Sequence, residues 1–270
     1  MIVDGKEIRD QIQEKLVQEV RARAVLPELC IFTVGSDSVT ETFVNVKRKF
    51  AQKIGIPLRE RKFQSNSTEA EILRYIEADA KKGNRGIVIQ LPLPKHFDRQ
   101  KVLDAVPITH DVDVLSTEAM KAFENDTLSI LPPVVGAIKE ILLRHNIFVG
   151  NKNVVIVGRG KLVGKPAAVW FQRHQSNVHI IDTKTKDSEK LLRDADIIVV
   201  GAGVPHFIKP SMIKDGVVIL DAGTSEVHGK VAGDADPLCA ERASIFTPVP
   251  GGIGPITVAI LFKNLLDLTA

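Results

Sequence analysis

The chain has 270 residues, of which 44% are hydrophobic and 26% charged, which is the balance of an ordinary globular protein. A formal net charge of only +3, without basic runs interleaved with aromatics, argues against a nucleic-acid partner. Cys30 and Cys239 stand in no metal-ligand spacing and fit a reducing compartment. The amino terminus shows no export signal and no apolar run is long enough for a membrane span, so we expect a cytoplasmic protein without a membrane or metal partner.

Helical and strand patterns alternate from end to end, which predicts an α/β protein built on parallel sheets. In the first half we expect helices over 6–24, 38–53 and 68–82, and strands over 29–35 and 86–90. A capping-box pattern, Ser38 with Glu41, and a C-terminal cap at Gly55 delimit the second helix. The expected apolar stripe of this helix consists of Val39, Phe43, Val46, Phe50 and Ile54.

In the second half, a helix over 137–144 leads towards another sheet. Four short apolar runs, beginning at Asn153, Asn177, Ala195 and Gly216, predict its strands, with helices between the first three. A final helix is expected over 256–268.

The first of these strands runs directly into a glycine loop that is followed by a helical pattern. This is the setting of a dinucleotide site, because glycines let the backbone approach a pyrophosphate and the helix dipole favours its charge. The loop residues that we single out are Gly158, Arg159, Gly160, Val163 and Gly164. A nucleoside-triphosphate P-loop is excluded, because it needs glycine at 159 and Ser or Thr at 166. A glycine turn that only packs a helix on a strand remains the alternative.

Two residues compete over the choice of cofactor. Asp182, followed by Thr183, stands after the next strand, where a carboxylate usually accepts hydrogen bonds from the adenosine ribose diol and favours NAD. Arg159 can instead pair with a 2′-phosphate and favour NADP.

Lys47 lies at the edge of the apolar stripe of the 38–53 helix. Most such lysines extend their stem to water. If the ammonium is instead held in a cleft, desolvation lowers its pKa, and the amine can donate or accept a proton near neutrality.

The motifs VGSDSVTETFVNVK, GIVIQLPLP, HDVDV, VVIVGRGKLVGKP and TPVPGGIGPIT resemble, in this order, those of bifunctional methylenetetrahydrofolate dehydrogenase/cyclohydrolase. The resemblance covers nearly the whole chain. It implies a folate-binding catalytic domain over 1–120 and 247–270, an NAD(P)-binding Rossmann domain over 121–246, and a cleft between them. The implied reactions are oxidation of 5,10-methylenetetrahydrofolate, with NADP as the expected cofactor and NAD as the alternative, and hydrolysis of the methenyl product to 10-formyltetrahydrofolate. It also implies a homodimer.

The resemblance assigns roles residue by residue. Lys47 matches the catalytic lysine, Gln90 the glutamine that orients it, and Asp113 the carboxylate that grips the pterin ring, while Phe43 is placed to stack on the aminobenzoyl group. The loop expected to line the folate pocket contains Pro250, Gly251, Gly252, Gly254 and Pro255. Structural alternatives remain for each: Gln90 as the end of a strand, Asp113 in an Asx turn, and the proline-glycine loop as a rigid turn.

The chain also departs from the family pattern. Phe43 replaces a tyrosine, so the phenolic hydroxyl is missing and hydrolysis is the more exposed activity. Val114 replaces a glycine, which leads us to expect a loop that does not need glycine's freedom, and Gly160 replaces a serine. The alternatives are therefore a dehydrogenase with weak or absent cyclohydrolase activity, and a folate- or nucleotide-binding protein without catalysis.

Overall fold

The computed structural model describes residues 1–35, 38–227 and 230–269. The side chain of Ser38, and with it the expected capping box, lies outside this description. The chain divides into two compact units: Asp10–Pro133 with Val258–Ala270, called here the Lys47 unit, and Met1–Arg9 with Val134–Thr257, called the glycine-loop unit. Within the described ranges, the structure contains no helix with both the length and the apolar character that a membrane span requires.

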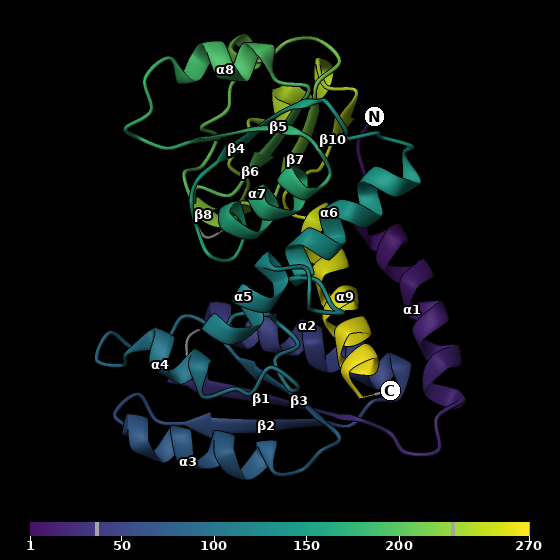
Figure 1. Cartoon of the computed structure of the whole chain (residues 1–270), viewed down its shortest axis with the longest axis vertical. Helices are drawn as coiled ribbons and strands as arrows, with labels where there is room; N and C mark the ends of the chain where they lie inside the picture. Colours follow the sequence, from purple (N-terminus) through teal and green to yellow (C-terminus); the bar gives the residue numbers. More distant parts are fainter. Residues whose placement is uncertain (36–37, 228–229, 270) are drawn as a thin grey trace. The chain divides into compact units, whose positions relative to one another are not determined.

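The Lys47 unit is built on a parallel sheet in the order β2-β1-β3, formed by Leu58–Phe63, Glu28–Val34 and Arg85–Ile89. The connections β1 to β2 and β2 to β3 run in opposite directions across the sheet, so right-handed crossovers place their helices on opposite faces. Accordingly, α2 (Ser38–Ile54) covers one face and α3 (Glu69–Ala80) the other (Figure 1). The remaining helices are α1 (Gly5–Arg21), α4 (Arg99–Asp104), α5 (Thr117–Glu124) and α9 (Ile253–Leu268); the division into units falls inside α1 and α9.

The strand β2 was not predicted, because its sequence LRERKF alternates charged residues with few apolar ones. It forms the edge of the sheet, where such a pattern is tolerated. Between α3 and the sheet lies a core of buried apolar side chains: Cys30, Phe32, Val34, Ile72, Ile76, Ile87, Ile89, Phe97, Val102, Leu103 and Val106.

A buried charge network crosses this same face. Asp79 of α3, only 1% exposed, accepts hydrogen bonds from Arg61 Nε at 3.0 Å and Nη2 at 3.1 Å, and forms an ion pair with Arg85. The Sγ of Cys30 lies 3.4 Å from Asp79 Oδ2. Burial, followed by the Asp79 charge, raises the pKa of Cys30 to about 12, so this cysteine remains an unreactive thiol.

The glycine-loop unit contains a parallel sheet in the order β10-β7-β6-β4-β5. Its strands are Ile245–Phe246, Val218–Asp221, Ile197–Val200, Asn153–Val157 and Asn177–Ile181. Since the chain passes from β4 out to β5 and then back to β6, α7 (Gly164–Arg173) and α8 (Ser188–Asp194) lie on opposite faces (Figure 1). Successive strands are added to one side of β4 with β5 and to its other side from β6 onwards, so the topological switch point lies between β4 and β6. Ligands of doubly wound sheets bind at such a point, beyond the carboxyl ends of the strands.

The smaller elements of this unit are α6 (Pro133–Arg144), two 3-10 turns (Pro210–Met212 and Pro237–Glu241) and the antiparallel hairpin of β8 (Ser225–Val227) and β9 (Lys230–Ala232). The hairpin was not predicted. The two parallel sheets with covering helices confirm the predicted α/β class. We expected domain boundaries near residues 120 and 247. The compact units divide between residues 133 and 134 and between 257 and 258, and also between 9 and 10.

Candidate active site

Helix α2 buries only part of the stripe that we expected: Phe50 and Ile54 are buried, and the side chain of Val39 lies outside the described residues. Phe43 and Val46 are 42% and 41% exposed, so their assignment to the buried stripe was wrong. The described side chains that α2 buries are Thr40, Val44, Phe50, Ala51 and Ile54. Lys47 continues the series Thr40, Val44, Ala51 and Ile54 at steps of three and four residues. The lysine therefore lies in line with the buried face rather than at its edge.

The amine of Lys47 is held by a buried amide. Its Nζ donates a hydrogen bond of 2.8 Å to Oε1 of Gln90, a residue only 8% exposed. Gln90 follows β3 directly, and its backbone N–H donates to the carbonyl of Phe32 at 2.9 Å, so it also extends the sheet. Its Nε2 donates to the Leu91 carbonyl at 2.9 Å, which leaves Oε1 facing the lysine. Gln90 thus ends the strand and orients Lys47 at the same time.

Asp113 lies in the segment that follows this sheet, tied to β3 by the bond from Ile87 N to the His110 carbonyl at 2.8 Å. The Asx-type turn there is made by Asp111, whose Oδ2 accepts the backbone N–H groups of Leu115 and Ser116 at 3.0 and 2.8 Å. That structural role therefore belongs to Asp111, and Asp113 is the carboxylate whose charge acts on the lysine.

Burial perturbs both ionisable groups. Desolvation lowers the pKa of the Lys47 ammonium, and the charge of Asp113 opposes that shift. Desolvation likewise raises the pKa of Asp113 to about 6, although the charge of Lys47 counteracts it. Such paired shifts bring an amine and a carboxyl group towards the pH range in which proton transfer is useful.

The loop beyond Asp113 corrects a second expectation. Val114 has a φ of 57°, a left-handed conformation that glycine adopts freely and a β-branched residue rarely does. Its side chain is fully buried, and this packing holds the unfavourable backbone in place. The loop does use the conformation that glycine would favour, contrary to our expectation.

Asn264 of α9 braces the same loop. It is 3% exposed, and its Nδ2 donates to the carbonyls of Val112 and Leu131 at 2.9 and 2.8 Å. Sequence reasoning missed it, because a single polar residue in a strongly apolar helix gives no sign of the segments that it contacts.

In the glycine-loop unit, steric contacts require glycine at both ends of the fingerprint. Gly158 has a φ of +101°, and a Cβ there would lie 2.7 Å from the Gly201 carbonyl oxygen. A Cβ on Gly164 would lie 2.0 Å from the carbonyl oxygen of Gly158. At Gly160, by contrast, a Cβ would have no described atom within 4 Å. Val163 fills the space beside Gly201, where a Cβ would lie 2.6 Å from its Cγ1.

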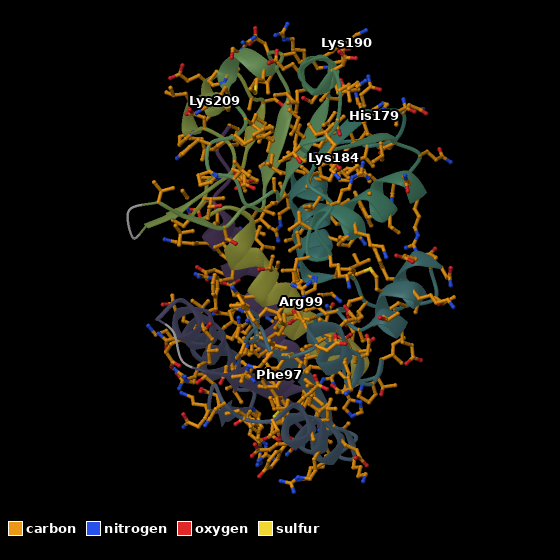
Figure 2. All side chains as sticks on the ribbon, turned by 90° about the vertical axis from the view of Figure 1, so that its left-hand side faces the viewer. Phe97, Arg99, His179, Lys184, Lys190 and Lys209 are labelled. Carbon is orange, nitrogen blue, oxygen red and sulfur yellow. The ribbon has the colours of Figure 1, made fainter. Side chains whose placement is uncertain are left out.

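Helix α7 starts at Gly164. Its N-cap residue is Val163, whose apolar side chain makes no capping hydrogen bond. Its N-terminal dipole therefore faces the glycine loop at the carboxyl end of β4, which is the arrangement that fits a pyrophosphate. Asp182 and Thr183 follow the neighbouring strand β5, at the same edge of the sheet. Figure 2 labels two exposed residues of this region, His179 in the middle of β5 and Lys184, which follows Thr183.

The proline-glycine loop follows β10 in this unit. Gly251 has a φ of +113°, and its carbonyl accepts the N–H of Gly5 at 2.9 Å. A Cβ on Gly252 would lie 2.7 Å from the Pro248 carbonyl oxygen, whereas Gly254 has no described atom within 4 Å of such a Cβ. Pro250 and Pro255 flank these glycines. The loop is therefore rigid and is anchored by the residue that begins α1.

Two buried carboxylates that were not predicted shape the same edge. Asp234 Oδ2 accepts the N–H groups of Ala202 and Gly203, each at 2.7 Å, in the loop after β6. Asp221, at the end of β7, accepts the N–H groups of Gly223 and Ala235, each at 2.8 Å. Burial raises the pKa of Asp221 to about 6.

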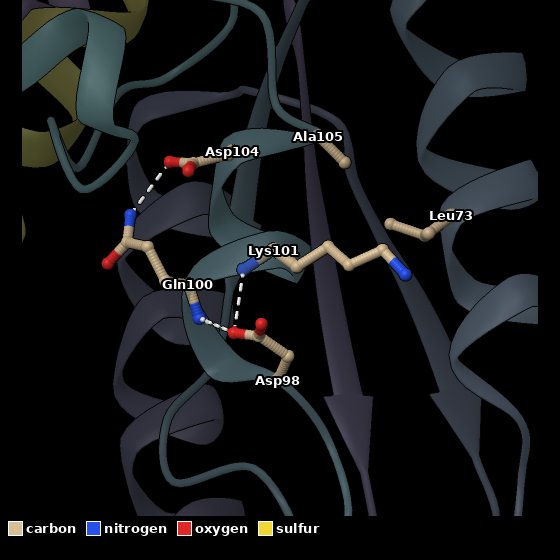
Figure 3. Close-up of a pocket in the computed structure, with 6 residues that line it drawn as sticks. All are labelled: Leu73, Asp98, Gln100, Lys101, Asp104 and Ala105. Atoms are coloured by element: carbon tan, nitrogen blue, oxygen red, sulfur yellow. Dashed lines mark hydrogen bonds between the residues drawn. The ribbon is translucent and has the colours of Figure 1, made fainter.

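A surface pocket of about 560 Å³ lies between α3 and α4 of the Lys47 unit, and none of the predicted site residues lines it (Figure 3). Its lining consists of Leu73, Asp98, Gln100, Lys101, Asp104 and Ala105. Asp98 Oδ1 caps α4 by accepting the N–H groups of Gln100 and Lys101 at 3.0 and 3.1 Å (Figure 3). Asp98 in this pocket therefore stabilises the N-terminus of α4.

Comparisons with known proteins agree with the arrangement in both units. A model of the tetrahydrofolate dehydrogenase/cyclohydrolase catalytic domain matches residues 3–113, and a model of the NAD(P)-binding domain of the same family matches residues 132–270. The bifunctional protein FolD of Agathobacter rectalis is 36% identical over 272 residues, covering 98% of each chain.

Solved structures show the same fold. The bifunctional enzyme FolD, methylenetetrahydrofolate dehydrogenase/cyclohydrolase, from Campylobacter jejuni has a TM-score of 0.96 at 30% identity, covering 100% of this chain and 98% of that one. The Trypanosoma brucei N5,N10-methylenetetrahydrofolate dehydrogenase-cyclohydrolase, complexed with NADP and an inhibitor, has a TM-score of 0.94 at 29% identity, covering 100% and 97%. This chain belongs to the tetrahydrofolate dehydrogenase/cyclohydrolase family.

Proposed function

We propose that the protein oxidises 5,10-methylenetetrahydrofolate to the 5,10-methenyl compound with NADP, and hydrolyses that product to 10-formyltetrahydrofolate. The observation that carries this proposal is the amine of Lys47, which is held 2.8 Å from Gln90 Oε1 and has its pKa lowered by burial. A lysine that only reached for solvent would have neither property. Membership of the family supports both activities.

For the oxidation, the nicotinamide supplies the hydride acceptor. The chain contributes binding and orientation: Gly158 and Gly164 let the backbone approach the pyrophosphate, and Asp113 accepts hydrogen bonds from the N–H groups of the pterin edge. The rigid loop of Gly251 and Gly252 is proposed to line the folate pocket.

For the hydrolysis, Lys47 is proposed to act on water. The uncharged amine, which a lowered pKa makes more abundant, accepts a proton as the water oxygen bonds to the methenyl carbon. The hydroxyl on that carbon then loses its remaining proton to solvent as the formyl C=O bond forms and the bond between the carbon and N5 breaks. N5 takes up the proton held by Lys47, which leaves the formyl group on N10 and the amine uncharged again. Gln90 fixes the amine throughout by accepting one of its hydrogen bonds.

The test supplies purified protein with methylenetetrahydrofolate and either NADP or NAD, and follows the methenyl and formyl products separately. We expect Lys47→Met to lower methenyl hydrolysis by about 100-fold or more, the usual worth of a positioned acid or base. Lys49→Met is the matched control, because Lys49 is exposed on the same helix. Undiminished hydrolysis in Lys47→Met would remove the proposed role of the lysine.

A second candidate is a dehydrogenase with weak cyclohydrolase activity, favoured by Phe43. This ring is 42% exposed one turn before Lys47 and carries no hydroxyl that could share in positioning the water. If the missing hydroxyl limits hydrolysis, Phe43→Tyr raises formyl production without changing methenyl formation. An unchanged hydrolysis rate would count against this candidate.

We also propose a homodimer formed through the glycine-loop units, and a cytoplasmic location. The dimer is expected from the family resemblance, and sedimentation that detects only monomer would refute it. The location is supported by two buried free cysteines, since their reduced state fits a reducing compartment.

A further inference from the structure

The two residues that compete over the cofactor form an ion pair with each other. Nε of Arg159 donates to Oδ2 of Asp182 at 2.6 Å, and its Nη2 lies 3.4 Å from the Ile180 carbonyl oxygen. The arginine follows Gly158 at the end of β4, and the aspartate follows β5, so the bond joins two neighbouring strand ends. The Nε–Nη2 edge of the guanidinium is thereby occupied by the protein itself.

The turn after β5 fixes the carboxylate in this position. Oδ1 of Asp182 accepts the N–H of Lys184 at 2.9 Å and the hydroxyl of Thr185 at 3.1 Å. The Asp182 N–H donates in return to Thr185 Oγ1 at 3.0 Å. The hydrogen bond from Arg159, together with those from Lys184 and Thr185, lowers the pKa of Asp182 to about 2, so the group stays ionised at any working pH.

The ribose diol of NAD and the 2′-phosphate of NADP need different partners at this site. The ribose diol of NAD can donate hydrogen bonds to Asp182 while the ion pair stays closed. A 2′-phosphate brings negative charge beside the same carboxylate, and its strongest partner is a guanidinium edge that the carboxylate already holds. NADP therefore gains Arg159 only when the arginine leaves Asp182 or turns its Nη1 side to the phosphate.

We infer that Asp182 is a specificity-determining residue, which limits the preference of the enzyme for NADP by holding Arg159 in an ion pair. The inference rests on the proposed dinucleotide site but not on the proposed folate chemistry. The wild-type protein then prefers NADPH less strongly than a variant in which the Arg159 guanidinium is released. Selectivity between NADH and NADPH then depends on the charges of Asp182 and Arg159, because the two cofactors differ only at the 2′ position that this pair is proposed to meet.

The experiment measures the dissociation constants of NADPH and NADH by calorimetry for the wild type, Asp182→Asn, Arg159→Met and the double variant. Asn keeps the size of the side chain and one acceptor oxygen for the turn but removes the charge. We expect Asp182→Asn to shift the affinity ratio towards NADPH by about tenfold to 100-fold, the worth of one charge-assisted hydrogen bond. Arg159→Met is expected to shift the ratio towards NADH. In the Arg159→Met background, Asp182→Asn is expected to shift the ratio towards NADPH less than it does in the wild type, because no arginine is released.

The matched control is Asp215→Asn, which breaks another exposed pair with an Arg242 Nε–Asp215 Oδ1 distance of 2.6 Å. Asp215 precedes β7, at the amino edge of the sheet, so its removal is expected to leave the ratio unchanged. If Asp182→Asn weakened the binding of NADPH and of NADH equally, Asp182 would only stabilise the turn after β5, and the inference would be overturned. If the affinity ratios shifted as expected but the protein did not turn over methylenetetrahydrofolate, the proposed function would be refuted and the inference about Asp182 would stand.

Discussion

Replacement of Asn264 by leucine tests whether α9 positions the loop that carries Asp113. Leucine has a similar volume, but it removes two hydrogen bonds of 2.9 and 2.8 Å to the carbonyls of Val112 and Leu131. A buried acceptor that loses its donor costs about 1–3 kcal/mol, so two of them cost about 2–6 kcal/mol. The apolar side chain regains part of this in a site that is 3% exposed, which leaves about 2–4 kcal/mol of lost stability.

The functional effect separates positioning from stability. Val112 immediately precedes Asp113, so a displaced carbonyl loosens the carboxylate proposed to bind the pterin. We expect KM for methylenetetrahydrofolate to rise about tenfold, while kcat and the affinity for the cofactor change much less. Urea unfolding measures the free energy of unfolding, and steady-state kinetics measures KM and kcat.

The control for this variant is Asn84→Ala, which removes an asparagine–carbonyl bond of 2.6 Å to Leu26 at the surface. It is expected to cost less than about 1 kcal/mol and to leave KM unchanged. If Asn264→Leu lost stability but kept the wild-type KM, Asn264 would be a structural residue only. If it lost neither, the two hydrogen bonds would have no energetic role.

Three further predictions follow from burial and steric contacts. Gly164→Ala forces a Cβ to within 2.0 Å of a carbonyl oxygen and is expected to abolish cofactor binding in calorimetry, whereas Gly160→Ala, which meets no described atom, keeps it. Asp79→Asn removes the α3 carboxylate from the buried Arg85, which keeps its ion pair with Glu28, and is expected to cost about 1.5–3 kcal/mol in urea unfolding; a loss below about 1 kcal/mol would contradict the role of the network. The folded-state pKa of Asp221, about 6, exceeds its unfolded value, so folding binds the proton and stability falls as the pH rises from about 4 to about 6. Asp221→Asn should lack this fall, and equal pH slopes for variant and wild type in urea unfolding would show that the buried carboxyl does not titrate in this range.

The parallel strands and the glycine loop were predictable, because each follows from local pattern. The buried strands are continuous apolar runs, and Gly158 and Gly164 stand at the close backbone approaches that such a loop contains. The loop pattern alone could not show that Gly160 is sterically dispensable. That distinction depends on which chain segments pass nearby, in this case Gly201 beside Gly158 and none of the described residues beside Gly160.

The errors arise where tertiary contacts override local pattern. In α2, Phe43 and Val46 suggested the buried face, but Val44 and Ala51 are buried instead, and Lys47, which lies on their side of the helix, donates a hydrogen bond to Gln90. At Val114, residue preference argued against a left-handed backbone, yet full burial of the side chain holds that conformation. In both cases the packing decides, because the local preferences amount to only about 1–2 kcal/mol.

The two units nevertheless follow one topological rule. Gln90 ends β3 in one sheet, while the glycine loop and Asp182 end β4 and β5 in the other, because the carboxyl ends of parallel strands meet at a common edge. Sequence can locate these residues, since each directly follows an apolar strand. Local pattern alone does not pair them with the side chains that helices bring to them: the pairing of Lys47 with Gln90 was expected only from the family resemblance, and that of Asn264 with Val112 was missed. Residues at strand ends can therefore be located from local pattern, whereas the helix residues that contact them are identified from the packing or from a known family.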